Sequence, residues 1–207
     1  KADGTGSLIA VLDSGIDPSH PDLRLDDCGA AKIKEVNPSG GLFTCKVPNG
    51  YNYADESFEI RDLTGSQHGQ HVAGIAAANG SQGAEPDFET SRRIDGVSPN
   101  AQLLAMKVFS NDAHEHDARD SDIIAAIEDS VKMGADVINM SLGGPNGVRD
   151  SSNGAWTAIE RAREAGCSPS SPRATRDSTS PRTRRPRTSS AASTTARWAT
   201  PPSTDRR

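Results

Sequence analysis

The sequence has 207 residues, of which 33% are hydrophobic, and its length suits one domain or slightly more. Its formal charge of −5 averages two unlike segments: residues 1–167 hold 14 basic and 26 acidic side chains, which gives −12, whereas residues 168–207 hold nine arginines and two aspartates, which gives +7. No apolar run approaches the roughly 20 residues of a membrane span, and no signal peptide is recognised, which leaves secretion open.

Most of the chain alternates between short apolar runs and segments with helical spacing. The run that ends at Leu12 is followed by Asp-Ser-Gly, which indicates a buried strand and a turn. Between residues 122 and 133, apolar side chains recur at helical intervals, with Ser121 as a candidate N-cap and Gly134 as a stop. We therefore expect strands at residues 7–12, 102–109 and 136–142, and helices at residues 72–78, 122–133 and 155–165.

Three segments do not fit this alternation. Residues 27–66 are a polar, glycine-bearing insert, and residues 110–120 are acidic and predict a surface loop. Residues 168–207 consist largely of Ser, Thr, Pro, Arg and Ala, and they contain no Leu, Ile, Val or Phe. Such a segment cannot bury enough apolar surface to offset the entropy of ordering, so we expect a disordered basic tail.

The order of strands and helices predicts an α/β fold, a doubly wound, mostly parallel sheet with helices on both faces. In such sheets the ligand site lies beyond the carboxyl ends of the strands. Asp13 and the segment 141–143 both lie at the C-termini of predicted strands. The sequence therefore predicts that they meet at one edge of the sheet.

Asp13 and His68 suit two parts of a catalytic triad. A hydroxyl nucleophile needs a base to take its proton, and the base needs a carboxylate that fixes its tautomer and stabilises its cation. Asp13 ends a buried strand and is followed by small residues, so a ring can approach it. His68 precedes Gly69 at the start of a helix and can point into a cleft, whereas His71 is expected to face inward and pack.

Four ordered motifs resemble the subtilisin-like serine peptidases of family S8 over residues 1–167, the N-terminal part of the catalytic domain. The sequence is most similar in pattern to the lactocepin-type peptidases of Gram-positive cell envelopes. Gln70 stands where Thr is commonest in the family, and its side chain is expected to lie outside the chemistry. The matching motifs are VLDSGIDPSHPDL, HGQHVAGIAA, DGVSPNAQLLAMKVF and GADVINMSLG.

The resemblance implies roles for individual residues. It makes Asp13 the triad aspartate and His68 the general base of a serine endopeptidase. Asp22 matches a position that often ligates structural calcium, and the chemistry itself needs no cofactor. The expected partner is an extended protein or peptide substrate, and the expected location is secreted or associated with the cell wall. The substrate-pairing strand matches Ser141, Leu142 and Gly143.

Two parts of the family's catalytic site have no counterpart in this sequence. After Gly166 the family continues with a buried strand that ends in Ala-Gly-Asn, whose asparagine stabilises the oxyanion, and the serine nucleophile follows much later. Here Cys167 is followed by Ser-Pro-Ser-Ser-Pro. Reading from the third base of the Cys167 codon can instead give Leu-Ala-Val-Val-Ser-Ala-Gly-Asn-Ser-Gly. We therefore expect a frameshifted tail after residue 167 and an inactive, poorly folded chain.

Other interpretations stay open beside the peptidase. His68 and His71 have the spacing of zinc ligands, but no third ligand falls at a recognisable spacing. The arginines of the tail attract phosphate, yet the tail has one aromatic residue and no binding fold, so no nucleic-acid partner is expected. A non-catalytic peptide-binding remnant is the main alternative. Cys28 and Cys45 form a disulfide in an oxidising compartment or are unpaired thiols, and Cys167 is left over.

Overall fold

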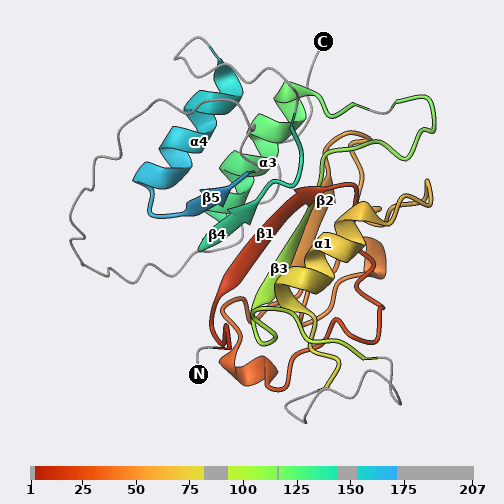
Figure 1. The fold of residues 1–207 in the computed structure, drawn as a ribbon, viewed down its shortest axis with the longest axis vertical. Coiled ribbons are helices and arrows are strands. Elements are labelled where there is room, and N and C mark those ends of the chain that lie inside the picture. Colours follow the sequence, from red (N-terminus) through yellow and green to blue (C-terminus); the bar gives the residue numbers. More distant parts are fainter. Residues whose placement is uncertain (1–2, 82–92, 116, 144–152, 172–207) are drawn as a thin grey trace, which may run out of the picture. The chain divides into compact units, whose positions relative to one another are not determined.

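The computed structural model describes residues 3–81, 93–115, 117–143 and 153–171. They form a five-stranded parallel sheet in the order β2-β3-β1-β4-β5, with helices on both faces (Figure 1). This confirms the predicted α/β class. The elements are β1 (Leu8–Asp13), β2 (Asn49–Asn52), β3 (Gln102–Lys107), β4 (Val137–Asn139) and β5 (Ser168–Ser170), helices α1 (His68–Ala77), α3 (Asp120–Lys132) and α4 (Gly154–Glu164), and the short 3-10 turns Cys28–Ala30 and Ser39–Gly41.

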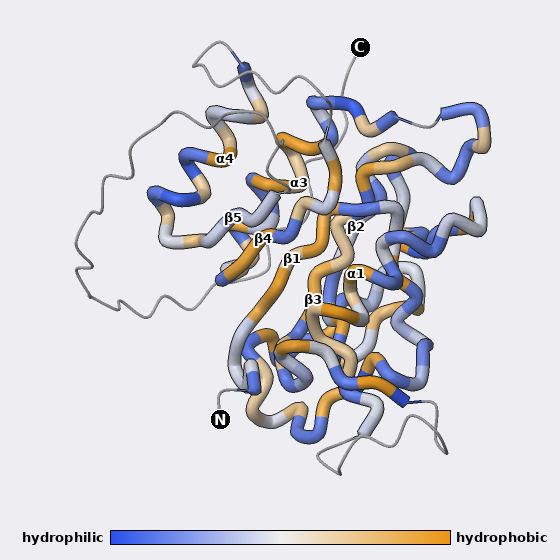
Figure 2. Tube along the Cα trace, viewed as in Figure 1, coloured by the Kyte–Doolittle hydropathy of each residue, from blue (hydrophilic) through white to orange (hydrophobic). Residues whose placement is uncertain are grey.

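The central strand β1 contributes to two hydrophobic cores, because successive side chains of a strand point to opposite faces. Leu8, Ala10 and Leu12 belong to the core that includes residues of α3 and α4. Val11 belongs to the second core, together with small residues of α1 such as Ala73. The hydropathy colouring shows the same centre, with the middle residues of β1 and β3 apolar (Figure 2).

The ends of the helices follow simple stop signals. Gly134 and Gly166 lie just beyond α3 and α4 with φ of 81° and 91°, a left-handed conformation that glycine adopts without strain. The prediction that Ser121 is the N-cap of α3 was wrong. That helix begins at Asp120, one residue before Ser121, and Ser121 bonds to the Asp122 side chain instead of capping the helix.

Two strands lie where the sequence predicts none. β2 falls within the polar insert 27–66 and pairs with β3, where Gly50 packs so closely on Ala105 that a side chain would not fit. β5 falls within residues 168–207, the segment expected to be a disordered tail. Its residues pair with β4, so residues 168–170 belong to the sheet, and residues 172–207 lie outside the described residues.

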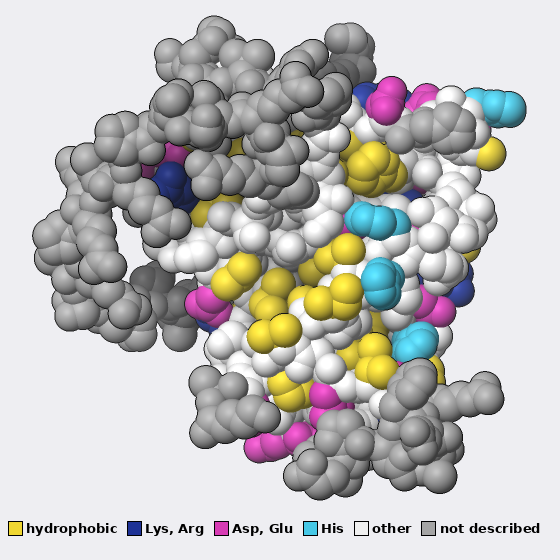
Figure 3. Space-filling view, viewed as in Figure 1, with side chains coloured by type: hydrophobic (Ala, Val, Ile, Leu, Met, Phe, Trp, Pro, Cys, Tyr) yellow, Lys and Arg dark blue, Asp and Glu magenta, His cyan; other side chains and the backbone are white. Residues whose placement is uncertain are grey.

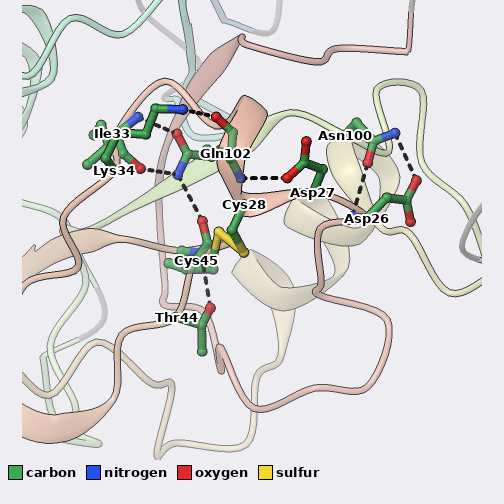
Figure 4. The surroundings of a disulfide bond; sticks show 11 residues. Asp26, Asp27, Cys28, Ile33, Lys34, Thr44, Cys45, Asn100 and Gln102 are labelled. Carbon is green, nitrogen blue, oxygen red and sulfur yellow. Dashed lines mark hydrogen bonds between the residues drawn. A yellow bond between two sulfur atoms is a disulfide. The ribbon is translucent and has the colours of Figure 1, made fainter.

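A disulfide joins Cys28 to Cys45 across the insert, which settles the pairing that the sequence left open (Figure 4). The buried side chain of Gln102 holds the same region together. Its Nε2 donates to the carbonyl oxygens of Ile33 and Cys45, at 2.9 and 2.8 Å, and its Oε1 accepts from the Ile33 amide at 2.7 Å. The insert is therefore bonded to the first residue of β3.

No helix in the described part of the chain has the length and apolar character needed to cross a lipid bilayer.

Candidate active site

Asp13 and His68 form a hydrogen-bonded pair at the carboxyl end of β1. Oδ1 of Asp13 lies 2.7 Å from Nδ1 of His68. The Asp13 side chain is 1% exposed, whereas the His68 side chain is 52% exposed. A buried carboxylate thus holds one nitrogen of a ring that otherwise faces solvent. The structure brings together the two residues that the sequence singled out.

The turn after β1 packs directly against the first residues of α1. The amide of Ser14 donates to Oδ1 of Asp13 at 2.7 Å, and the hydroxyl of Ser14 accepts from the amide of Gly69 at 3.0 Å. A side chain at Gly69 would stand 2.8 Å from the amide nitrogen of Gly15 and closer still to its carbonyl oxygen. Glycine after the histidine is therefore required for the helix to start beside the aspartate.

Gln70 has a structural role that its sequence position did not reveal. Its Oε1 accepts from the amide of Asp17 at 2.7 Å. This bond ties α1 to the chain that leaves the Asp13 turn. Since the bond involves neither Asp13 nor His68, the side chain supports the frame of the site.

His71 corrects the expectation of an inward-facing histidine. It is exposed, whereas Gly69, Ala73 and Ala77 are the buried residues of α1. Small residues four apart form the face that contacts the sheet, and residue 71 lies halfway between two of them, on the opposite side. Histidine side chains accordingly gather on the exposed face of the molecule that carries α1 (Figure 3).

Ser141, Leu142 and Gly143 follow β4, which lies next to β1 in the sheet. This places them near the carboxyl edge that carries Asp13. Ser141 accepts a hydrogen bond from Nδ2 of Asn139 at 2.9 Å, and Leu142 packs partly against the core under α3 and α4. Gly143 is exposed. Their expected role in pairing with substrate stays a prediction.

Asp22 is buried, and its expected role as a calcium ligand stays a prediction. One carboxylate oxygen accepts from the amide of Ile94 at 3.3 Å, and the backbone carbonyl accepts from the amide of Asn79 at 2.7 Å. Within residues 3–81, 93–115, 117–143 and 153–171, no three His, Cys, Asp or Glu side chains are grouped so that they could hold a metal ion. In the structure, Asp22 accepts hydrogen bonds from backbone amides of two neighbouring segments.

A buried aspartate bonded to an exposed histidine beside the strand ends of a parallel α/β sheet matches the Asp–His part of the Asp–His–Ser arrangement found in one class of hydrolases. The comparison with protein families is specific. The chain belongs to the subtilase family, Peptidase S8, whose profile matches residues 4–179.

Named relatives support this assignment. The PI-type and PIII-type proteinases of Lactococcus lactis subsp. cremoris are each 43% identical over 175 residues, which cover 80% of this chain and 9% of the relative. Subtilisin E of Bacillus subtilis (strain 168) is 37% identical over 164 residues, which cover 79% of this chain and 32% of the relative. The predicted resemblance to lactocepin-type and subtilisin-like peptidases is confirmed. The chain spans less than a third of the length of these relatives.

Proposed function

We propose that this chain carries the Asp–His half of a serine endopeptidase site, with Asp13 orienting His68 as general base, and that it does not cleave substrate by itself. The observation that carries the proposal is the 2.7 Å bond between buried Asp13 and exposed His68. Membership of the subtilase family supports the reaction class.

The geometry suits proton transfer at a single atom. A carboxylate accepts hydrogen bonds only, so Oδ1 of Asp13 favours the His68 tautomer that carries its proton on Nδ1. Nε2 then has a free lone pair on the exposed side of the ring. That nitrogen can take the proton of a hydroxyl nucleophile, and the nearby carboxylate stabilises the cation that results.

The proposed substrate is a protein or peptide in extended conformation. Ser141, Leu142 and Gly143 would bind it by adding a strand, with backbone hydrogen bonds holding the peptide and pockets reading alternate side chains. The exposure of Gly143 and the position of the segment beside β1 support this role. A secreted or cell-wall location follows from the family, and the Cys28–Cys45 disulfide supports an oxidising compartment.

The proposed inactivity rests on two missing groups. No serine hydroxyl in the described part of the chain bonds to Nε2 of His68, and no motif of the sequence matches the family's oxyanion asparagine or nucleophile. In subtilisin, loss of the nucleophile lowers kcat by a factor on the order of 10⁶. Loss of one oxyanion donor costs about 3–4 kcal/mol in the transition state.

A casein-hydrolysis assay tests the proposal. The purified chain is expected to release peptides no faster than the buffer blank, and His68→Ala is expected to make no difference. Hydrolysis that His68→Ala abolishes would overturn the proposed inactivity.

Restoring the proposed reading frame provides a positive control for this assay. We propose that the coding DNA after Gly166 encodes Leu-Ala-Val-Val-Ser-Ala-Gly-Asn-Ser-Gly in another frame, which sequencing checks directly. A gene with the frame restored is expected to encode an active enzyme, in which Asp13→Asn lowers kcat by a factor of about 10⁴ because the histidine tautomer is no longer fixed. An active enzyme indifferent to Asp13→Asn would contradict the assigned roles.

A further inference from the structure

Lys107 is a buried cation beside the aspartate of the candidate site. It is the last residue of β3, which lies next to β1, and the parallel register pairs it with Asp13. Both residues are 1% exposed. A lysine that loses its water needs a structural reason, since the charged ammonium group is costly to bury.

The ammonium group of Lys107 is connected to the site through one residue. Its Nζ donates to the carbonyl oxygen of Ser14. The amide of the same Ser14 donates to Oδ1 of Asp13, and its hydroxyl accepts from the amide of Gly69. Lys107 therefore holds the residue that joins the aspartate to the start of α1.

The charge of Lys107 lies among several carboxylates, of which the buried Asp13 is one. Oδ2 of Asp13 is buried and has no hydrogen-bond partner in the described part of the chain, so hydrogen bonds alone do not compensate this carboxylate. Burial lowers the pKa of Lys107, and the carboxylates of Asp62, Asp55, Glu59 and Asp13 oppose that shift. The described residues contain no direct ion pair to Lys107. The Lys107 cation is thus attracted by several carboxylates, including that of Asp13.

We propose that Lys107 is a positioning residue for the Asp13–His68 pair. It fixes the Ser14 peptide group that bonds to Asp13, and its positive charge offsets the cost of keeping the Asp13 carboxylate buried and ionised. The proposal rests on the proposed function, because it assigns to Lys107 the task of keeping that pair in working geometry.

Proton NMR of the purified chain provides the test. The Nδ1 proton of His68, held by Asp13, is expected as a low-field resonance that exchanges slowly with water and disappears in His68→Ala. Lys107→Met, which keeps the length of the side chain and removes its charge, is expected to lose this resonance or shift it to the position of a solvent-exposed imidazole. Circular dichroism of each variant checks that its secondary structure is retained.

Lys46→Met is the matched control. Lys46 is also 1% exposed and also donates to a backbone carbonyl, but that carbonyl belongs to Pro99, at 2.6 Å, and not to the Asp13 turn. It is expected to keep the His68 resonance. If Lys107→Met does not fold, Lys107→Gln, which keeps a donor without the charge, carries the same expectation.

The outcomes separate the two proposals. Absence of the resonance from the folded unmodified chain would contradict the Asp13–His68 pair and thus the proposed function. Its presence, unchanged in folded Lys107→Met, would overturn only the role of Lys107. Failure of both Lys107 variants to fold, beside a folded Lys46→Met, would assign Lys107 a purely structural role and also overturn the proposal.

Discussion

Gly69 is the residue whose size decides how closely α1 approaches the Asp13 turn. In Gly69→Ala, the added methyl group would meet the backbone of Gly15, which cannot rotate away as a flexible side chain could. We expect the free energy of unfolding to fall by about 1–3 kcal/mol, the usual cost of overpacking. Urea denaturation, followed by circular dichroism, measures this.

Gly74, in the same helix, provides the comparison. A methyl group there would meet only Cδ1 of Ile94, at 3.8 Å, which is an ordinary contact. Since alanine is the better helix former, Gly74→Ala is expected to be neutral or to stabilise the chain by up to about 1 kcal/mol. Equal losses in the two variants would show that helix propensity, and not the approach to Gly15, governs position 69.

At the scale of residues, the pairing of Asp13 with His68 could be predicted because the motifs around both residues resemble those of the subtilisin-like peptidases. A strand end followed by small residues is compatible with one partner and a histidine at a helix start with the other, but neither local pattern is specific by itself. The orientation of His71 could not be predicted from spacing alone. It depends on which face of α1 meets the sheet, and a helix rich in Gly and Ala shows little amphipathic contrast.

At the scale of elements, strands with apolar sequences could be predicted, whereas the strands with polar sequences were missed. β1 and β3 are apolar runs, so their pattern is visible. β2 reads Asn-Gly-Tyr-Asn and β5 reads Ser-Pro-Ser. Pro169 has no amide proton, which an edge strand tolerates because one side of it needs no partner in the ladder.

The insert that contains β2 is expected to depend on its disulfide. Cys28 and Cys45 are separated by 17 residues. A cross-link across a loop of this size removes conformational entropy from the unfolded chain and stabilises the fold by about 3 kcal/mol. Joint replacement, Cys28→Ser with Cys45→Ser, is therefore expected to lower the free energy of unfolding by about that amount in urea.

Reductant provides the control for this prediction. Dithiothreitol is expected to destabilise the unmodified chain as much as the double replacement does, and to leave the double variant unchanged. A thiol count on the unfolded, unreduced chain should give one free cysteine, Cys167. A count of three would show that the bond does not form.

At the scale of the whole molecule, the described chain has two cores on one sheet and the proposed Asp–His pair at its carboxyl edge. The carboxyl edge carries Asp13, and His68 faces solvent beside it. The chain spans less than a third of the length of its relatives. Asp13 and His68 still lie within hydrogen-bond distance, because Asp13 ends the central strand β1. Both cores use β1, so the pair is held from two sides.

The stability of the whole chain should depend on pH through Lys46. Burial lowers the pKa of Lys46 from its ordinary value of 10.5 to about 7, and the charge of Asp26 opposes this shift. In the folded chain Lys46 therefore releases its proton near pH 7, whereas in the unfolded chain it keeps the proton to much higher pH. Between these values unfolding takes up a proton, so the free energy of unfolding rises with pH.

Urea denaturation between pH 7 and about pH 9 measures this dependence. For full uptake of one proton, the rise is at most about 1.4 kcal/mol per pH unit. Lys46→Met is expected to remove that part of the rise. Lys132→Met, at an exposed lysine whose pKa is raised by its bond to Asp129, is expected to keep the full rise. Identical pH profiles for the unmodified chain and Lys46→Met would mean that Lys46 stays charged in the folded chain, held by its bond to Pro99 and by Asp26.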